Sequence, residues 1–199
     1  AQAAIATQRT TLVDLWTHAA GVRSLKHLSP EQMGWAVMNA TGVLEPQRPG
    51  ADAEVEKTIP KASVAADPAK LRDRDVKVEA LLHERNRGNL NVFVSMYAQS
   101  AGQPQDDFFA TPDQALFVAN GGSVMGWAAG GQLIQRLTPL AEPKALTEEL
   151  YLSTLARRPT DAEVAEVAQL LAARPNEKAI VLRDMIWALV TSAEFRFNH

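Results

Sequence analysis

Two neighbouring acidic residues followed by two aromatic residues are the first group in this sequence whose types could do chemistry. Asp106 and Asp107 stand directly before Phe108 and Phe109. Acid–base catalysis needs carboxylates that converge on one substrate, and adjacent residues of a chain rarely point the same way. We therefore interpret the group as an acidic turn whose phenylalanines pack in the core. The two aspartates are kept as candidate interaction residues.

The last six residues, 194–199, contain a second group of polar side chains. Glu194, Asn198 and His199 are candidate interaction residues in this segment. Aromatic side chains bury large apolar areas, so we expect Phe195 and Phe197 to pack. Glu194 and Asn198 are then expected to make local polar contacts. We interpret the segment as structural first and as an interaction surface second.

No residue pattern in the sequence indicates a cofactor or a metal site. The four histidines are too scattered for a metal-ligand spacing such as HExxH. The absence of cysteine excludes thiolate zinc sites, iron–sulfur clusters, a thiol nucleophile and covalent haem attachment within this chain. The glycine pairs match neither a phosphate-binding loop nor a dinucleotide fingerprint, and no GxSxG motif is present. The sequence thus predicts no catalytic residue, no cofactor and no metal, although ligands from distant segments could still meet in space.

Length and composition predict a folded helical domain. The chain has 199 residues, 46% of them hydrophobic and 22% charged, which is enough to bury a core. A net charge of -3 gives no reason to expect a nucleic-acid partner, because that affinity depends on Lys and Arg. No apolar run approaches the roughly 20 residues that a membrane-spanning helix needs.

Apolar residues recur at helical spacing along most of the chain, with no convincing alternation typical of strands. We therefore predict one all-α domain over residues 1–199, an irregular multi-helix bundle of about eight helices. Three consecutive helices are expected after about residue 141. The clearest apolar stripe on one face consists of Leu182, Met185, Ile186, Leu189, Val190 and Ala193.

Helix starts and interruptions are marked by capping residues and prolines. Ser29 before Pro30, Thr111 before Pro112, and Thr160 each place a hydroxyl where a helix should begin. Residues 45–74 contain four prolines, which forbid one long helix there. We predict an extended surface loop over 45–74, with room for a short helix at about 52–58.

Two segments near the C-terminus resemble a known family. Residues 150–160 match the pattern LYL-x-x-L-x-R-x-P-T, and residues 184–199 match D-x-x-WAL-x-x-S-x-EF-x-FNH. Both patterns are similar to those of the planctomycete-specific C-terminal domain of unknown function. Weaker similarity occurs at residues 28–42 and 110–120.

The resemblance implies an origin and a location but no activity. Members of the family are usually the C-terminal part of large exported planctomycete proteins, some with c-type cytochrome modules upstream. It therefore implies that this chain is the C-terminal part of a longer protein in the cell envelope or secreted.

Three functions are open at this point. The first is a non-catalytic interaction or scaffold module that binds other domains of its parent protein or an envelope protein. The second is an enzyme or ligand-binding domain for an envelope polysaccharide, with two carboxylates from separate helices. The third is a docking partner of a c-type cytochrome module through Asp106 and Asp107.

Overall fold

The chain folds into an irregular bundle of helices, as the apolar periodicity predicts. A computed structural model describes residue 11 and residues 26–97 and 122–198. The helices within these ranges are α2 (Pro30–Thr41), α3 (Arg48–Thr58), α4 (Lys61–Val64), α5 (Pro68–Arg85), α6 (Arg87–Tyr97), α8 (Gly122–Gly130), α9 (Gln132–Leu137), α10 (Pro143–Leu155), α11 (Asp161–Ala173) and α12 (Lys178–Val190). Short 3₁₀ turns occur at η1 (Glu45–Gln47), η2 (Pro175–Glu177) and η3 (Glu194–Arg196). The all-α fold class is confirmed.

A short antiparallel ladder connects the two ends of the described bundle. β1 (Lys26–His27) pairs with β2 (Phe197–Asn198), with Lys26 opposite Asn198 and His27 opposite Phe197. The Leu28 amide extends this contact by donating to the Arg196 carbonyl at 2.9 Å. The segment before α2 is thereby hydrogen-bonded to the segment after α12.

The main core lies among α2, α6 and α8–α12, which we call the bundle. α12 contributes Leu182, Ile186 and Val190, which are fully buried. Met185 and Leu189 pack against this core while partly exposed, as the predicted stripe requires. Ala193, placed in the same stripe, lies beyond the end of α12 and is exposed.

Two of the three helix starts predicted from capping residues are confirmed. The Ser29 hydroxyl accepts from the Gln32 amide and the Gln32 side chain accepts from the Ser29 amide, so α2 begins with a capping box. Thr160 and Glu163 form the same reciprocal pair at the start of α11. The start predicted at Thr111 lies outside the described residues.

The extended loop predicted for residues 45–74 is wrong, whereas the short helix expected at about 52–58 is the second half of α3. This region holds η1, α3, α4 and the beginning of α5. Pro46, Pro49 and Pro68 each occupy the first turn of a helix, and Pro60 is the residue that caps α4. An amide in the first helical turn has no partner within its helix, so proline there removes no hydrogen bond. The prolines therefore separate short helices instead of preventing them.

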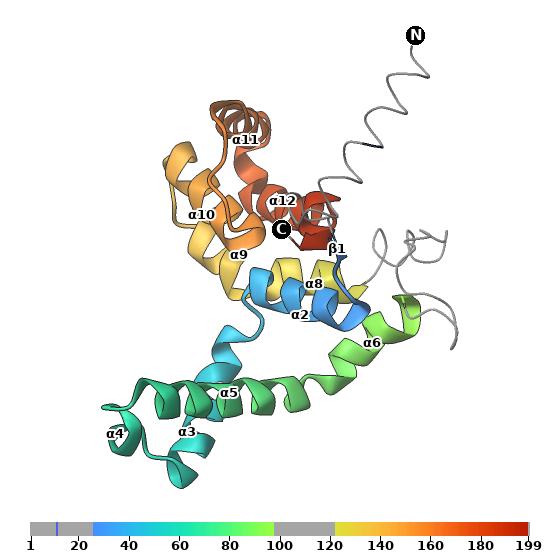
Figure 1. Cartoon of the computed structure of the whole chain (residues 1–199). Coiled ribbons are helices and arrows are strands. Elements are labelled where there is room, and N and C mark those ends of the chain that lie inside the picture. The colour runs from blue at the N-terminus through green and yellow to red at the C-terminus, as the bar shows by residue number, and fades with distance from the viewer. Residues whose placement is uncertain (1–10, 12–25, 98–121, 199) are drawn as a thin grey trace.

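Residues 48–85, which form α3, α4 and α5, project from the bundle (Figure 1). We call these three helices the arm. α3 and α5 run side by side along its length, and α4 lies at the tip (Figure 1). The arm leaves the bundle after α2 and returns to it through α6.

None of the helices in the described ranges is long and apolar enough to cross a membrane.

Candidate functional site

The arm has a small core of its own. Ala51 and Val55 of α3 pack against Val78 and Leu82 of α5, and all four are buried. Trp35 of α2 packs against this cluster and also against a second cluster formed by Met38, Leu44 and Leu90. The arm core is therefore continuous with the bundle through one tryptophan.

A buried arginine of α5 joins this helix to α3 and to the turn that follows α3. Only 1% of Arg74 is exposed. Its guanidinium donates to Asp52 at 2.7 Å, to Glu56 at 2.6 Å and to the Ile59 carbonyl at 3.0 Å. These hydrogen bonds raise the pKa of Arg74 and lower the pKa of the Asp52 carboxyl. Arg74 is thus a charged core residue whose partners all lie on α3 and the turn after it.

Paired amides fix the base of the arm. Gln47 of η1 donates to Asn86 at 3.3 Å, and Asn86 donates back to Gln47 at 3.0 Å. Asn86 is 2% exposed and also donates to the Leu82 carbonyl. It is the residue between α5 and α6, so this pair connects the two points where the chain enters and leaves the arm.

Charged side chains from the bundle reinforce the base. Arg136 of α9 donates to both carboxylate oxygens of Glu45, at 2.6 and 2.8 Å, and to Glu149 of α10 at 2.9 Å. On α5, close to the base of the arm, His83 lies 2.8 Å from Glu31 of α2. Arg136 holds Glu45 and Glu149 in one network, which restricts movement more than an isolated surface pair does. We infer that the arm is held in one orientation.

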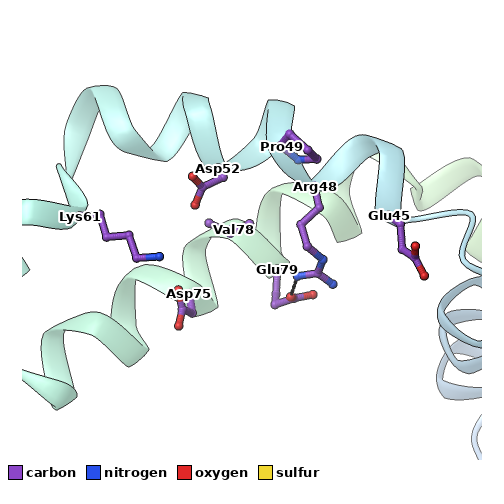
Figure 2. A pocket seen from close by; sticks show the side chains of 8 residues that line it. All are labelled: Glu45, Arg48, Pro49, Asp52, Lys61, Asp75, Val78 and Glu79. Carbon is purple, nitrogen blue, oxygen red and sulfur yellow. Dashed lines mark hydrogen bonds and ion pairs between the residues drawn. The ribbon is translucent and has the colours of Figure 1, made fainter. Parts of the chain in front are cut away.

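A charged cleft of about 530 Å³ lies along one face of the arm (Figure 2). It is lined by Glu45, Arg48, Pro49, Asp52, Lys61, Asp75, Val78 and Glu79. Four of its charges are already paired, because Arg48 contacts Glu79, Asp52 contacts Arg74 and Glu45 contacts Arg136. Lys61 and Asp75 form no ion pair with any described residue. Figure 2 shows the Lys61 side chain reaching into the space between the two helices.

Asp52 is not suited to act as a general acid in this cleft. A general acid at neutral pH needs a carboxyl whose pKa is raised. The pKa of Asp52 is lowered instead, because Arg74 donates a hydrogen bond to its carboxylate. Lys61 and Asp75 offer one charge of each sign to a polar ligand or a protein surface.

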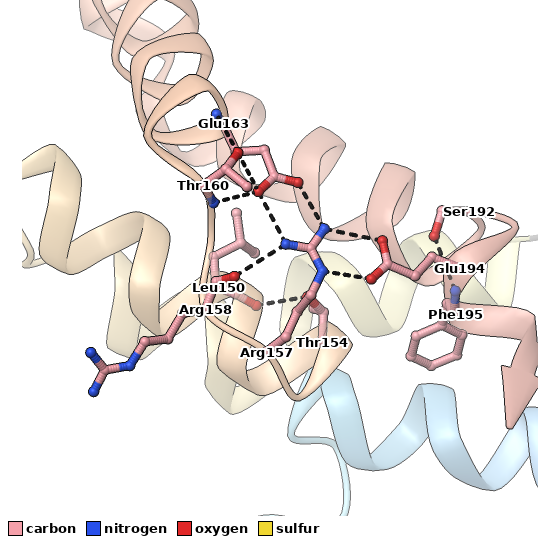
Figure 3. Close-up of polar contacts among 9 residues, drawn as sticks. All are labelled: Leu150, Thr154, Arg157, Arg158, Thr160, Glu163, Ser192, Glu194 and Phe195. Carbon is pink, nitrogen blue, oxygen red and sulfur yellow. Dashed lines mark hydrogen bonds and ion pairs between the residues drawn. The ribbon is translucent and has the colours of Figure 1, made fainter. Parts of the chain in front are cut away.

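A second polar cluster forms where residues 150–160 meet the C-terminal segment (Figure 3). Arg157 donates to Glu163 at 2.7 and 3.0 Å and to Glu194 at 2.6 and 3.1 Å. Its guanidinium also lies 5.2 Å from the centre of the Tyr151 ring. Hydrogen bonds from Arg157 lower the pKa of Glu163 to about 2. The two segments that carry the family resemblance therefore meet at the Arg157–Glu194 ion pair.

The candidate interaction residues of the C-terminus have structural partners where they are described. Phe195 packs against the main core, which confirms the prediction for this residue, and the side chain of Phe197 lies outside the described part of the chain. The contact of Glu194 is not local, since Arg157 is 37 residues away in sequence. Asn198 pairs through its backbone in the β1–β2 ladder. His199, Asp106 and Asp107 lie outside the described residues.

The low pKa of Glu163 predicts how stability changes with pH. A carboxyl whose pKa is below its ordinary value of 4.5 in the folded state stabilises the fold above pH 4.5, and that contribution is lost as the pH falls toward 2. Arg157→Gln removes the partner, so its free energy of unfolding should fall less steeply than the wild type between pH 5 and 2.5. Urea unfolding at a series of pH values measures both slopes.

Arg158→Gln is the matched control, because Arg158 is exposed and its side chain takes no part in this cluster. It should keep the slope of the wild type. Equal slopes for Arg157→Gln and the wild type would show that Arg157 is not the cause of the lowered pKa.

Among the described residues, no group of three or more histidine, aspartate or glutamate side chains could hold a metal ion. Comparisons with protein-family models, curated proteins and solved structures find no match to this chain. The resemblance to the planctomycete domain therefore rests on the residues of the chain itself.

Proposed function

We propose that this chain is a non-catalytic interaction or scaffold module of an exported multidomain protein, which binds its partner through the arm. The observation that carries the proposal is a projection of three helices with a fixed base and a charged cleft. A binding surface that is ordered before contact loses less conformational entropy on association. The contacts of Arg74, Asn86 and Arg136 supply that order here.

The partner we propose is another domain of the parent protein or a protein of the cell envelope. This part of the proposal comes from the family resemblance, which also implies a secreted or envelope location. The cleft supports a protein partner because its free charges, Lys61 and Asp75, are of opposite sign and stand on different helices. Complementary charges of this kind favour a specific partner more than they add affinity.

Photo-crosslinking in the parent protein tests the proposal. A photoreactive amino acid replaces Lys61 in the cleft or, as a control, Lys144 on the exposed start of α10. We expect a crosslink to a second domain or a second protein from position 61 and none from position 144. Mass spectrometry of the crosslinked peptides identifies the partner.

Two results would contradict this function. One is a crosslink from position 144 with none from position 61. The other is hydrolysis of an envelope polysaccharide by the purified chain that is lost in Asp75→Asn, because the cleft would then be a catalytic site.

A further inference from the structure

A second groove, of about 380 Å³, follows the arm on the other side of the contact between its helices. It is lined by Glu54, Val55 and Thr58 of α3 and by Lys77, Ala80 and Leu81 of α5. On α5, the core positions 74, 78 and 82 form one stripe. Helical spacing places 75 and 79 on one side of this stripe and 77 and 81 on the other. The charged cleft and this groove therefore lie on different faces of the arm.

The floor of the groove is apolar and only partly covered. Val55 belongs to the arm core, and Leu81 packs against that core while half-buried. Ala80 is exposed, and its small side chain allows another helix to approach closely. Two antiparallel helices with one apolar face are half of a four-helix bundle.

The rims of the groove carry opposite charges. Glu54 stands on the α3 rim and Lys77 on the α5 rim. Lys77 forms no ion pair with any residue that the structure describes. Glu54 contacts Arg85 through its Oε2 atom at 2.6 Å, which leaves Oε1 for another donor. A surface that holds both members of an ion pair, each on its own rim, can be complementary to itself.

We propose that two copies of this chain associate through this groove. With a two-fold axis along the arm, α3 of one copy lies over α5 of the other, so all neighbouring helices are antiparallel. The same operation places each Glu54 opposite the Lys77 of the second copy, as a two-fold interface requires. The charge pattern of the groove is what favours a second copy over a helix of an unrelated protein.

The dimensions of the arm indicate a weak dimer. α3 has 11 residues and is therefore about 16 Å long, which limits the shared face. Such a face lies at the lower end of specific interfaces. We expect a dissociation constant in the micromolar range, and the dimer forms without any other domain.

A charge exchange tests the proposal with the purified chain. Lys77→Glu and Glu54→Lys each convert both ion pairs of the dimer into like-charge contacts. We expect either variant to dimerise about tenfold more weakly than the wild type. An equal mixture of the two variants restores opposite charges at both contacts, so heterodimers should form with the affinity of the wild type. Sedimentation equilibrium measures the dissociation constant of the dimer for the wild type, for each variant and for the mixture.

Val76→Glu is the control, because Val76 is 61% exposed and lies outside the groove lining. It should dimerise as the wild type does, and circular dichroism should show all variants folded. A wild type that stays monomeric at millimolar concentration would overturn the proposal, as would a mixture that associates no better than its components. Either result would leave the crosslinking from position 61 unaffected, since that position lies in the charged cleft.

Discussion

Replacing Gly131 by alanine is expected to lower the free energy of unfolding by about 3 kcal/mol or more. Gly131 lies between α8 and α9, where the end of α2 crosses. A Cβ atom at this position would lie 1.9 Å from the Thr41 carbonyl oxygen and 2.8 Å from the Trp127 carbonyl oxygen. Both neighbours are backbone atoms, so no side chain can rotate to relieve the contact. α2 and the α8–α9 connection must then move apart, and the arm begins just after α2.

Gly130→Ala is the matched control for this prediction. A Cβ atom at Gly130 has no neighbour within 4 Å, and Gly42 is the one described glycine with a positive φ. Alanine at position 130 should leave stability unchanged or raise it by about 0.5 kcal/mol. Urea unfolding at neutral pH measures both variants. Equal stabilities would show that the close crossing of α2 over Gly131 does not exist in solution.

Arg74→Met is expected to loosen the arm and to lower the melting temperature by several degrees. Methionine retains the length of the side chain but removes the guanidinium. Asp52, Glu56 and the Ile59 carbonyl then lose their common donor. The two carboxylates are left close together without a cation between them. Since the effect begins inside the arm, the bundle should retain its helices.

Arg72→Met separates the loss of this buried contact from the loss of a charge. Arg72 is on the same helix, is exposed and forms no ion pair with the described residues. Its replacement should leave the melting temperature unchanged within one degree or so. A similar decrease in both variants would mean that net charge, and not the buried contact, sets the stability of the arm.

The helices of the bundle could be predicted because their local signals agree with their packing. The capping box of Ser29, the capping box of Thr160 and the stripe of α12 each depend on residues a few positions apart. The four prolines of residues 45–74 argue against one long helix, so the sequence predicts an extended loop with a short helix at about 52–58 and does not predict the rest of the arm. Proline has a different effect in the first turn of a helix, and only the bounds of each helix show where that turn is.

The polar contacts that define the arm could not be predicted from spacing. Asn86 and Gln47 are 39 residues apart, and Arg136 and Glu45 are 91 apart. The burial of Arg74 could be predicted from spacing, since it lies four residues before Val78 and eight before Leu82 on the buried stripe of α5. An arginine at a core position of a helix indicates a buried ion pair. The sequence alone does not identify the carboxylates that complete it.

The interpretation of the C-terminus changes with the Arg157 cluster. Residues 150–160 and 184–199 are far apart in sequence, yet Arg157 connects them through Glu194. Most of the polar side chains in this cluster already have partners within the fold. We therefore assign these two segments to stability, and the arm is the surface that we propose for binding.

Binding through the arm, as proposed, requires that the arm is held in one orientation before any partner binds. The chain contains no cysteine, so two introduced cysteines are the only sites for spin labels. Ala62 at the tip of the arm and Ala162 at the start of α11 are both exposed and suit this purpose. The labelled chain is diluted with unlabelled protein, so that distances between copies do not contribute. Pulsed electron–electron double resonance should give a single narrow distance distribution for the wild type and a broad one for Arg74→Met. A broad or double distribution in the wild type would contradict the claim.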